Sequence, residues 1–315
     1  MTMRFTWLWR LFFLLTVLLG ANFGGFTYAY LARSTAGNPF FGNQGDAGAL
    51  LPAYLAYVEQ VTSARLTNVA VYGDDFGRVL AQATVASLGL LTIALTVSIV
   101  LGITIGLLGV RVRPPGVRGW LTAVTTVGLA TPSFFFWRLV VALFFLMLLN
   151  LPGASMPLPI QGYGWDAHLI LPVIALSLRP TAQIGQIMAG LLAGELGRQY
   201  VVAARGRGLA EARVVRHHAL RNVWAPIFQA LAGTVRLLVG ELVVVEWLFA
   251  WPGLGYLLAA TLIPAEFASA SVESRFLDPP LVASLLTIFA AIFLVTDLVA
   301  GQAVRLADPR QRVSG

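Results

Sequence analysis

The sequence predicts an all-α integral membrane protein with six transmembrane helices, in which both chain ends lie in the cytoplasm. Of its 315 residues 58% are apolar and only 11% are charged, whereas about a quarter of a soluble domain is charged. About 20 mostly apolar residues span a bilayer. Six segments meet this requirement, at 7–31, 83–110, 120–149, 168–193, 224–249 and 279–304.

The positions of the arginines predict the orientation. With the N-terminus inside, most of the 21 arginines fall in cytoplasmic segments, including three at 111–118 and six at 198–221. The opposite side then carries more acidic than basic residues. Because cytoplasmic loops are rich in basic residues, this asymmetry favours an N-in, C-in arrangement.

The first apolar segment and the segments outside the membrane follow from composition. Residues 1–32 resemble a signal peptide, but their apolar stretch exceeds the 7–15 residues of a signal core, so we expect a retained first helix. Residues 32–82 predict an external loop with a short surface helix in "LLPAYLAYVEQVTSARL". Residues 250–278 look interfacial, with Trp247, Trp251 and Tyr256 suited to the lipid headgroups.

Two missing residue types exclude whole classes of chemistry. The chain has no cysteine, which excludes disulfides, thiolate metal sites and thiol catalysis. All of its basic residues other than histidine are arginine, so the phosphate-binding loop that requires a lysine is also excluded. If the protein uses ATP, another subunit must bind the nucleotide.

One basic segment stands out, "QYVVAARGRGLAEARVVRHHALRNVWAP" at 199–226. It fits a nucleic-acid-binding arm, a membrane-surface helix or a docking element. The predicted orientation places it in the longest cytoplasmic loop. Gly206 and Gly208 divide it into two short helices, the second beginning near 209–211 and ending before Pro226. A nucleic-acid arm is disfavoured because aromatic residues do not alternate with the basic ones, and binding of anionic lipid would add to docking.

This segment resembles the cytoplasmic loop of the permeases of binding-protein-dependent ABC importers. That loop reads E-A-A, three residues and G, and here these positions are Val202, Ala203, Ala204 and Gly208. The distance from Gly208 to Pro226 is typical of the peptide/nickel branch. "DFGRVL", "TPSFFFW", "HLILPVIALSL", "VVVEWLFAWPGLGYLL" and "DPPL…DPRQR" also resemble the B-type subunit of dipeptide and oligopeptide permeases. The chain departs from the pattern at Val202, at Ala210 (often a helix-capping Ser) and in the external "NPFFGNQGDAG".

The resemblance implies that residues 1–70 hold the first helix and an external loop. Residues 71–315 would form the permease domain, with a coupling loop at about 195–223. The partners would be a second homologous permease, two ABC ATPase subunits and an extracytoplasmic binding protein, in a bacterial or archaeal plasma membrane. The partner ATPases would bind ATP and Mg, whereas this chain would bind no cofactor or metal and would not be an enzyme. The ATPase-docking residues would be Ala203, Ala204, Arg205, Gly208, Leu209, Glu211, Arg213, Val214, His218 and Arg221.

Charged residues inside predicted spans are the other candidates for function, since each costs roughly 2.5–3.5 kcal/mol to insert. Arg138, Arg179 and Glu246 are candidates for the translocation path, with Arg138 attracting a peptide carboxylate. The structural alternative is that Arg236 pairs with Glu241 or extends toward the headgroups, and that Arg179 lies near the inner interface.

Three further alternatives stay open at this point. His217 and His218 are adjacent on a helix and point about 100° apart, so they are poor joint metal ligands. A secondary transporter or channel would need internal repeats or discontinuous helices. An importer of the same family could carry nickel chelates or oligosaccharides in place of peptides.

Overall fold

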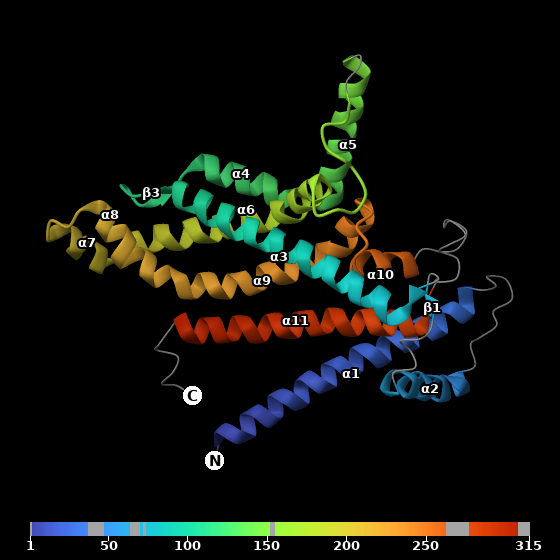
Figure 1. Cartoon of the computed structure of the whole chain (residues 1–315). Helices are drawn as coiled ribbons and strands as arrows, with labels where there is room; N and C mark the ends of the chain where they lie inside the picture. The colour runs from blue at the N-terminus through green and yellow to red at the C-terminus, as the bar shows by residue number, and fades with distance from the viewer. Residues whose placement is uncertain are drawn as a thin grey trace. The chain divides into compact units, whose positions relative to one another are not determined.

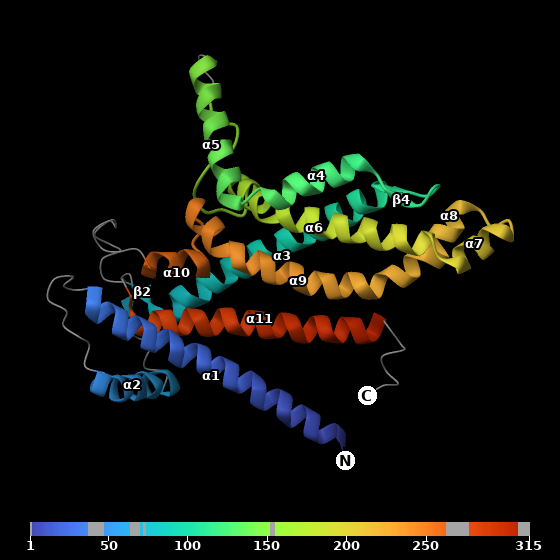
Figure 2. The ribbon, with the colours of Figure 1, turned by 180° about the vertical axis from the view of Figure 1, so that it is seen from behind.

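The computed structural model describes residues 2–36, 47–63, 70–71, 74–151, 155–262 and 277–307. Within these ranges the chain is almost entirely helical, as Figure 1 and Figure 2 show from opposite sides. The strands described are two residues long and form two antiparallel pairs. They are β1 (Ala70–Val71) with β2 (Asp74–Asp75), and β3 (Val110–Arg111) with β4 (Gly116–Val117). The predicted all-α class is confirmed.

Six helices of the described chain are long and apolar enough to cross a membrane, which confirms the predicted number. They are Phe12–Ala32, Phe76–Leu108, Ser133–Asn150, Ala167–Leu196, Glu211–Leu248 and Pro279–Val299.

The third span differs from the prediction. Residues 120–149 do not form one helix, because α4 (Gly119–Ala130) ends before Pro132 and α5 (Ser133–Asn150) begins after it. Proline disfavours a helical conformation in the residue before it, and Thr131 is accordingly extended, with ψ 108°. At roughly 18 Å α4 is too short to cross a bilayer, so α5 alone is a candidate span.

The chain divides into two compact units, Met1–Leu88 with Pro252–Val295 and Gly89–Trp251 with Thr296–Gly315. The first unit contains α1 (Thr2–Ala36), η1 (Ala47–Ala49), α2 (Leu50–Thr62), the start of α3 (Phe76–Leu108), α10 (Leu254–Leu262) and most of α11 (Pro279–Ala307). Helix α2 is the short helix predicted in the external loop. Most of the predicted loop "GNPFFGNQGDAG" and all of residues 263–276 lie outside the described residues.

A polar network joins three helices of the first unit. The Asn22 amide on α1 donates to Tyr57 Oη (3.1 Å) and to Thr287 Oγ1 (3.0 Å), and its oxygen accepts from Tyr54 Oη (3.1 Å). The buried Phe26 ring stacks on Tyr57 in the same region. Helix α1 therefore supplies partners that the polar groups of α2 and α11 need, since buried polar groups are costly when unpaired.

The second unit contains the remainder of α3, the β3–β4 hairpin, α4, α5, η3 (Ala167–Leu169), α6 (Ile170–Leu196), α7 (Gln199–Gly206), α8 (Glu211–Arg213), the π-helical η4 (Val214–Ala219) and α9 (Leu220–Leu248). Both views show α6 between α4 and α9, and α5 turning away from α4 (Figure 1, Figure 2).

Glycines allow the helices of this unit to approach closely. A Cβ added at Gly102 of α3 would lie 2.7 Å from Ile184 Cβ of α6, and one at Gly106 would lie 2.7 Å from Met188 Cβ and 2.9 Å from the Gly185 carbonyl oxygen. Because the obstacles include backbone and the first side-chain atoms, they cannot simply rotate away. These positions fix α3 against α6.

The Gly106→Ala variant is expected to lose roughly 1–3 kcal/mol of stability, because an overpacked core must shift its backbone. Gly190→Ala is the matched control on α6, since a Cβ there meets nothing within 4 Å. Melting of the detergent-purified protein measures both. Equal melting temperatures would contradict the close packing of α3 on α6.

The expectation that Trp251 faces the headgroups is wrong. Trp251 is completely buried and packs edge-to-face on Tyr163 (centroids 4.8 Å) and Trp165 (5.6 Å). Two hydrogen bonds hold the 160s loop next to Trp251. Gln161 Nε2 donates to the Leu248 carbonyl at 2.9 Å, and the backbone N–H of Gly162 donates to the Phe249 carbonyl, also at 2.9 Å. Aromatic pairing inside the unit thus takes the place of lipid contact.

Candidate functional site

The basic segment folds as α7, a turn and a longer second limb. Helix α7 ends where Arg207 N–H donates to the Ala203 carbonyl (3.2 Å) and Gly208 N–H donates to the Arg205 carbonyl (2.9 Å). Gly208 has φ +76°, a left-handed conformation that favours glycine after a helix. The glycine of the resembled loop therefore stands where the chain must reverse.

The second limb does not end before Pro226, as the sequence suggested. It continues from α8 through η4 into α9, and Pro226 lies inside α9. A proline removes one hydrogen bond, here to the carbonyl four residues earlier, and both Pro226 and Asn222 are exposed. The opposite, buried face runs uninterrupted through Ala219, Val223 and Ile227, so packing maintains the helix past the proline.

The inner face of the segment is part of the hydrophobic core of its unit. Val201, Ala204 and Val214 are at most 1% exposed, and they cluster with Leu196 of α6 and Leu121 of α4. Apolar burial of this kind is worth about 25 cal/mol per Å². The segment is therefore a packed projection of the second unit rather than a free loop.

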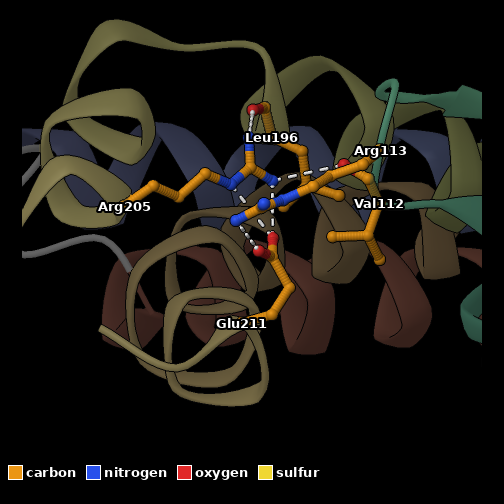
Figure 3. Close-up of polar contacts among 5 residues, drawn as sticks. All are labelled: Val112, Arg113, Leu196, Arg205 and Glu211. Atoms are coloured by element: carbon orange, nitrogen blue, oxygen red, sulfur yellow. Dashed lines mark hydrogen bonds and ion pairs between the residues drawn. The ribbon is translucent and has the colours of Figure 1, made fainter. Parts of the chain in front are cut away.

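Two arginines from different parts of the chain share the Glu211 carboxylate (Figure 3). Arg205 donates from Nη2 and Nε to Glu211 Oε1 at 2.7 and 3.0 Å, and Arg113 Nη2 lies 2.6 Å from Oε2. Arg205 also donates to the backbone carbonyls of Val112 (3.2 Å) and Leu196 (3.4 Å). We call Arg113, Arg205 and Glu211 the arginine clamp. It ties both limbs of the segment to the β3–β4 hairpin and to the end of α6.

A second polar cluster lies at the base of the segment. Tyr200 Oη donates to Glu195 Oε2, and the Asn222 amide donates to Tyr200 Oη at 3.0 Å. Burial, together with the hydrogen bond to Glu195, raises the pKa of the Tyr200 phenol. The phenol thus keeps its proton and joins α7 to the ends of α6 and α9.

These contacts divide the ten predicted docking residues into two groups. Ala204 and Val214 are buried, and Arg205 and Glu211 are engaged in the clamp, so they shape the segment. Ala203, Gly208, Arg213 and Arg221 are exposed, while Leu209 and His218 are half-buried. Sequence reasoning missed Arg113, although its hairpin, "RVRPPGVR", was visible as a basic turn.

The membrane charges pair differently from the structural alternative. Arg179 Nη1 lies 2.5 Å from Glu241 Oε1, and Arg236 Nη2 lies 3.3 Å from Asp297 Oδ1. The predicted Arg236–Glu241 pair is wrong, because side chains five apart on a helix do not face each other. Arg179 Nε and Glu241 Oε2 are buried and have no hydrogen-bond partner in the described chain.

The other two candidates for the translocation path lie in different surroundings. Arg138 is exposed on α5, whereas Glu246 on α9 is completely buried. The Arg179 side chain is 35% exposed and that of Glu241 13%. Since charges facing lipid are costly, the exposed part of the Arg179–Glu241 pair requires cover by protein or water.

Comparison with known proteins decides the family. Residues 98–313 match the family described as "Binding-protein-dependent transport system inner membrane component". The chain belongs to this family. As a permease-family member with six candidate spans, it is a multi-pass membrane protein and one component of a transport system that also has other components.

Named relatives cover most of the permease chain. It is 30% identical over 261 residues to the dipeptide transport system permease protein DppB of Lactococcus lactis subsp. cremoris, covering 82% of this chain and 80% of the relative. It is 26% identical over 265 residues to a putative peptide permease protein of Brucella suis biovar 1, covering 83% and 79%. The family match includes the arginine clamp and the Arg179–Glu241 pair. The domain boundary near residue 70 stays a prediction.

Proposed function

We propose that this chain is the transmembrane permease subunit of an ATP-driven importer and forms half of the translocation path for peptides. The supporting observation is the basic segment of this permease-family chain. The inner face of the segment packs in the core and is held by the arginine clamp, while its outer face is exposed. Such a rigid projection suits the transmission of motion between subunits, since packed interfaces are bistable. The relatives named for peptide and dipeptide transport favour peptides as substrate.

The partners in this proposal are a second, homologous permease, two ABC ATPase subunits and an extracytoplasmic binding protein. The exposed residues Ala203, Gly208, Arg213 and Arg221 meet the ATPase, which binds ATP and Mg. This chain binds no cofactor and catalyses no reaction. It lies in a bacterial or archaeal plasma membrane, with the first helix retained for its contacts to α2 and α11.

The test is transport by the assembled system. Permease, ATPases and cognate binding protein are reconstituted in liposomes, and peptide uptake and ATP hydrolysis are measured with a panel of di- and oligopeptides. Peptide- and receptor-dependent uptake that requires ATP is expected. Uptake that persists without ATPases would favour a secondary transporter or channel, and uptake of nickel chelates or oligosaccharides alone would refute the peptide substrate.

The proposed N-in, C-in orientation has a direct test, because the chain has no cysteine of its own. Ala210→Cys lies between the two limbs of the basic segment, and Ser155→Cys lies between α5 and α6; both positions are exposed. An impermeant maleimide is expected to label position 155 in intact spheroplasts, and position 210 only in inside-out vesicles stripped of peripheral subunits. Permeabilised cells, in which both positions react, are the control; the reverse pattern contradicts the orientation.

A further inference from the structure

An apolar groove lies in the second unit, on α4 and on the candidate membrane spans α3 and α6. It has a volume of about 560 Å³ and is open to the surroundings. Residues of α3, α4 and α6 line it. The lining residues include Leu101, Ile105, Ala123, Val124, Val127 and Ser177.

Close helix packing builds this groove into the fold. Gly102 brings α3 onto α6, and a Cβ added at Gly128 of α4 would lie 2.8 Å from Ala182 Cβ. Both α3 and α4 are thus held close to α6, so the three lining helices cannot shift independently of one another. The hydroxyl of Ser177 donates to the Ile174 carbonyl (3.3 Å), so this donor already has a hydrogen-bond partner within the protein.

The exposed part of the groove is apolar. Leu101 is 49% exposed, Val124 53% and Val127 66%. Within a bilayer such a hollow is filled by hydrocarbon or by another protein, because interiors pack without large voids. Its lining includes residues 97–105 of α3, about two turns of helix, and its volume of about 560 Å³ can hold part of an extended hydrocarbon chain.

Positive charge lies at one end of the groove and indicates which lipid headgroup could bind there. Helix α3 ends three residues after Ile105, and α4 begins four residues before Ala123. Arg111 in β3 and Arg118 directly before α4 therefore lie beyond the same end of the groove. Arg111 and Arg118 are exposed and take part in none of the ion pairs found in the described chain, whereas Arg113 is engaged by Glu211. Trp120, 45% exposed, lies at the same end, as aromatic residues do at the headgroup level.

We propose that this groove binds one acyl chain of an anionic phospholipid, whose phosphate is held by Arg111 and Arg118. Basic residues at a membrane surface attract anionic lipids, and arginine matches the geometry of phosphate oxygens. The site needs only a membrane-embedded chain and does not depend on the peptide substrate.

Native mass spectrometry of the detergent-purified full chain, with its accompanying subunits, tests the proposal. Phosphatidylglycerol and phosphatidylcholine are titrated against the wild type and two variants. Val124→Trp fills the groove, and the double variant Arg111→Gln/Arg118→Gln removes the phosphate ligands. The wild type is expected to retain one phosphatidylglycerol in preference to phosphatidylcholine. The arginine variant should lose roughly 30-fold in that preference, and the tryptophan variant should lose the bound lipid.

The controls carry matched changes elsewhere. Leu146→Trp adds the same ring at an exposed position of α5, and Arg310→Gln/Arg312→Gln removes the same charge from the C-terminal tail. Both should bind lipid like the wild type. The proposal is overturned if the wild type shows no preference for the anionic lipid, or if either test variant binds like its control. It is also overturned if Val127→Cys cross-links efficiently to another subunit, which would place a protein helix in the groove.

Discussion

The Glu211→Gln variant is expected to lose the fixed shape of the basic segment and, with it, most of its retention of ATPase subunits. Within the clamp, Glu211 is the residue that contacts both arginines. Its carboxylate oxygens lie 2.6 Å from Arg113 Nη2 and 2.7 Å from Arg205 Nη2. Hydrogen bonds to charged groups are worth about 1.5–3 kcal/mol. The loss falls on Arg205, whose side chain is only 15% exposed.

Two measurements separate the structural effect from the functional one. Hydrogen exchange of residues 199–213 should accelerate roughly tenfold or more, as a local stability loss above 1.4 kcal/mol requires. Co-purification of ATPase subunits should fall in parallel. Glu59→Gln removes a carboxylate from an exposed position of α2 and should change neither.

A graded series sharpens the result. Arg113→Gln breaks only the contact of a side chain that is 67% exposed, so it should cost less than about 1 kcal/mol. Arg205→Gln should have an effect as large as that of Glu211→Gln. It removes the ion pair with Glu211 and, in addition, the hydrogen bonds to the Val112 and Leu196 carbonyls. If all three variants exchange and co-purify like the wild type, the clamp does not shape the segment.

The Glu241→Ala variant is expected to melt at a markedly lower temperature than the wild type. It leaves Arg179 charged and unpaired against α9, and breaking a buried ion pair by removing one partner costs about 3–5 kcal/mol. Thermal melting of the purified protein measures the loss. Arg198→Gln is the control, since its side chain lies outside the spans, is 69% exposed and is 3.6 Å from Glu195, so the pair should contribute under about 1 kcal/mol.

The double variant Arg179→Met/Glu241→Leu distinguishes a structural pair from a path-lining one. Replacing both charges by apolar groups should restore most of the stability that Glu241→Ala loses. If the pair serves only packing, peptide uptake recovers with stability. If Arg179 attracts a substrate carboxylate, the double variant is stable but transports poorly. Failure of the double variant to recover stability would contradict the pairing itself.

The sequence predicted local and periodic features well and contacts between distant segments poorly. Six apolar stretches, the short α2 and the glycine turn at 208 depend on neighbouring residues, and the structure contains all of them. The division at Pro132 was visible in the sequence, but a long apolar run masked it. The helix continuing past Pro226 was not visible, because burial on its opposite face decides it.

The partners of the charged residues could not be predicted for the same reason. Arg205 meets Val112, 93 residues away, and Arg179 meets Glu241, 62 residues away. No spacing rule reaches such distances, whereas the near pair Arg236–Glu241 was favoured only because it is close in sequence. Of the docking segment, sequence reasoning identified the position and many residues, but not which of them face inward.

Because α8, the π-helical η4 and α9 follow one another as one continuous helical stretch, the residues between Glu211 and Glu241 set the relative orientation of these two side chains about the helix axis. Roughly 45 Å of helix separates them, and each is held by an arginine from another helix or hairpin. Inserting or deleting one residue in the α-helical part of this stretch, between residues 220 and 241, would turn one carboxylate about 100° relative to the other, so that both ion pairs could not form together. The number of residues in this stretch is therefore constrained, even where the identities of its side chains are free to vary.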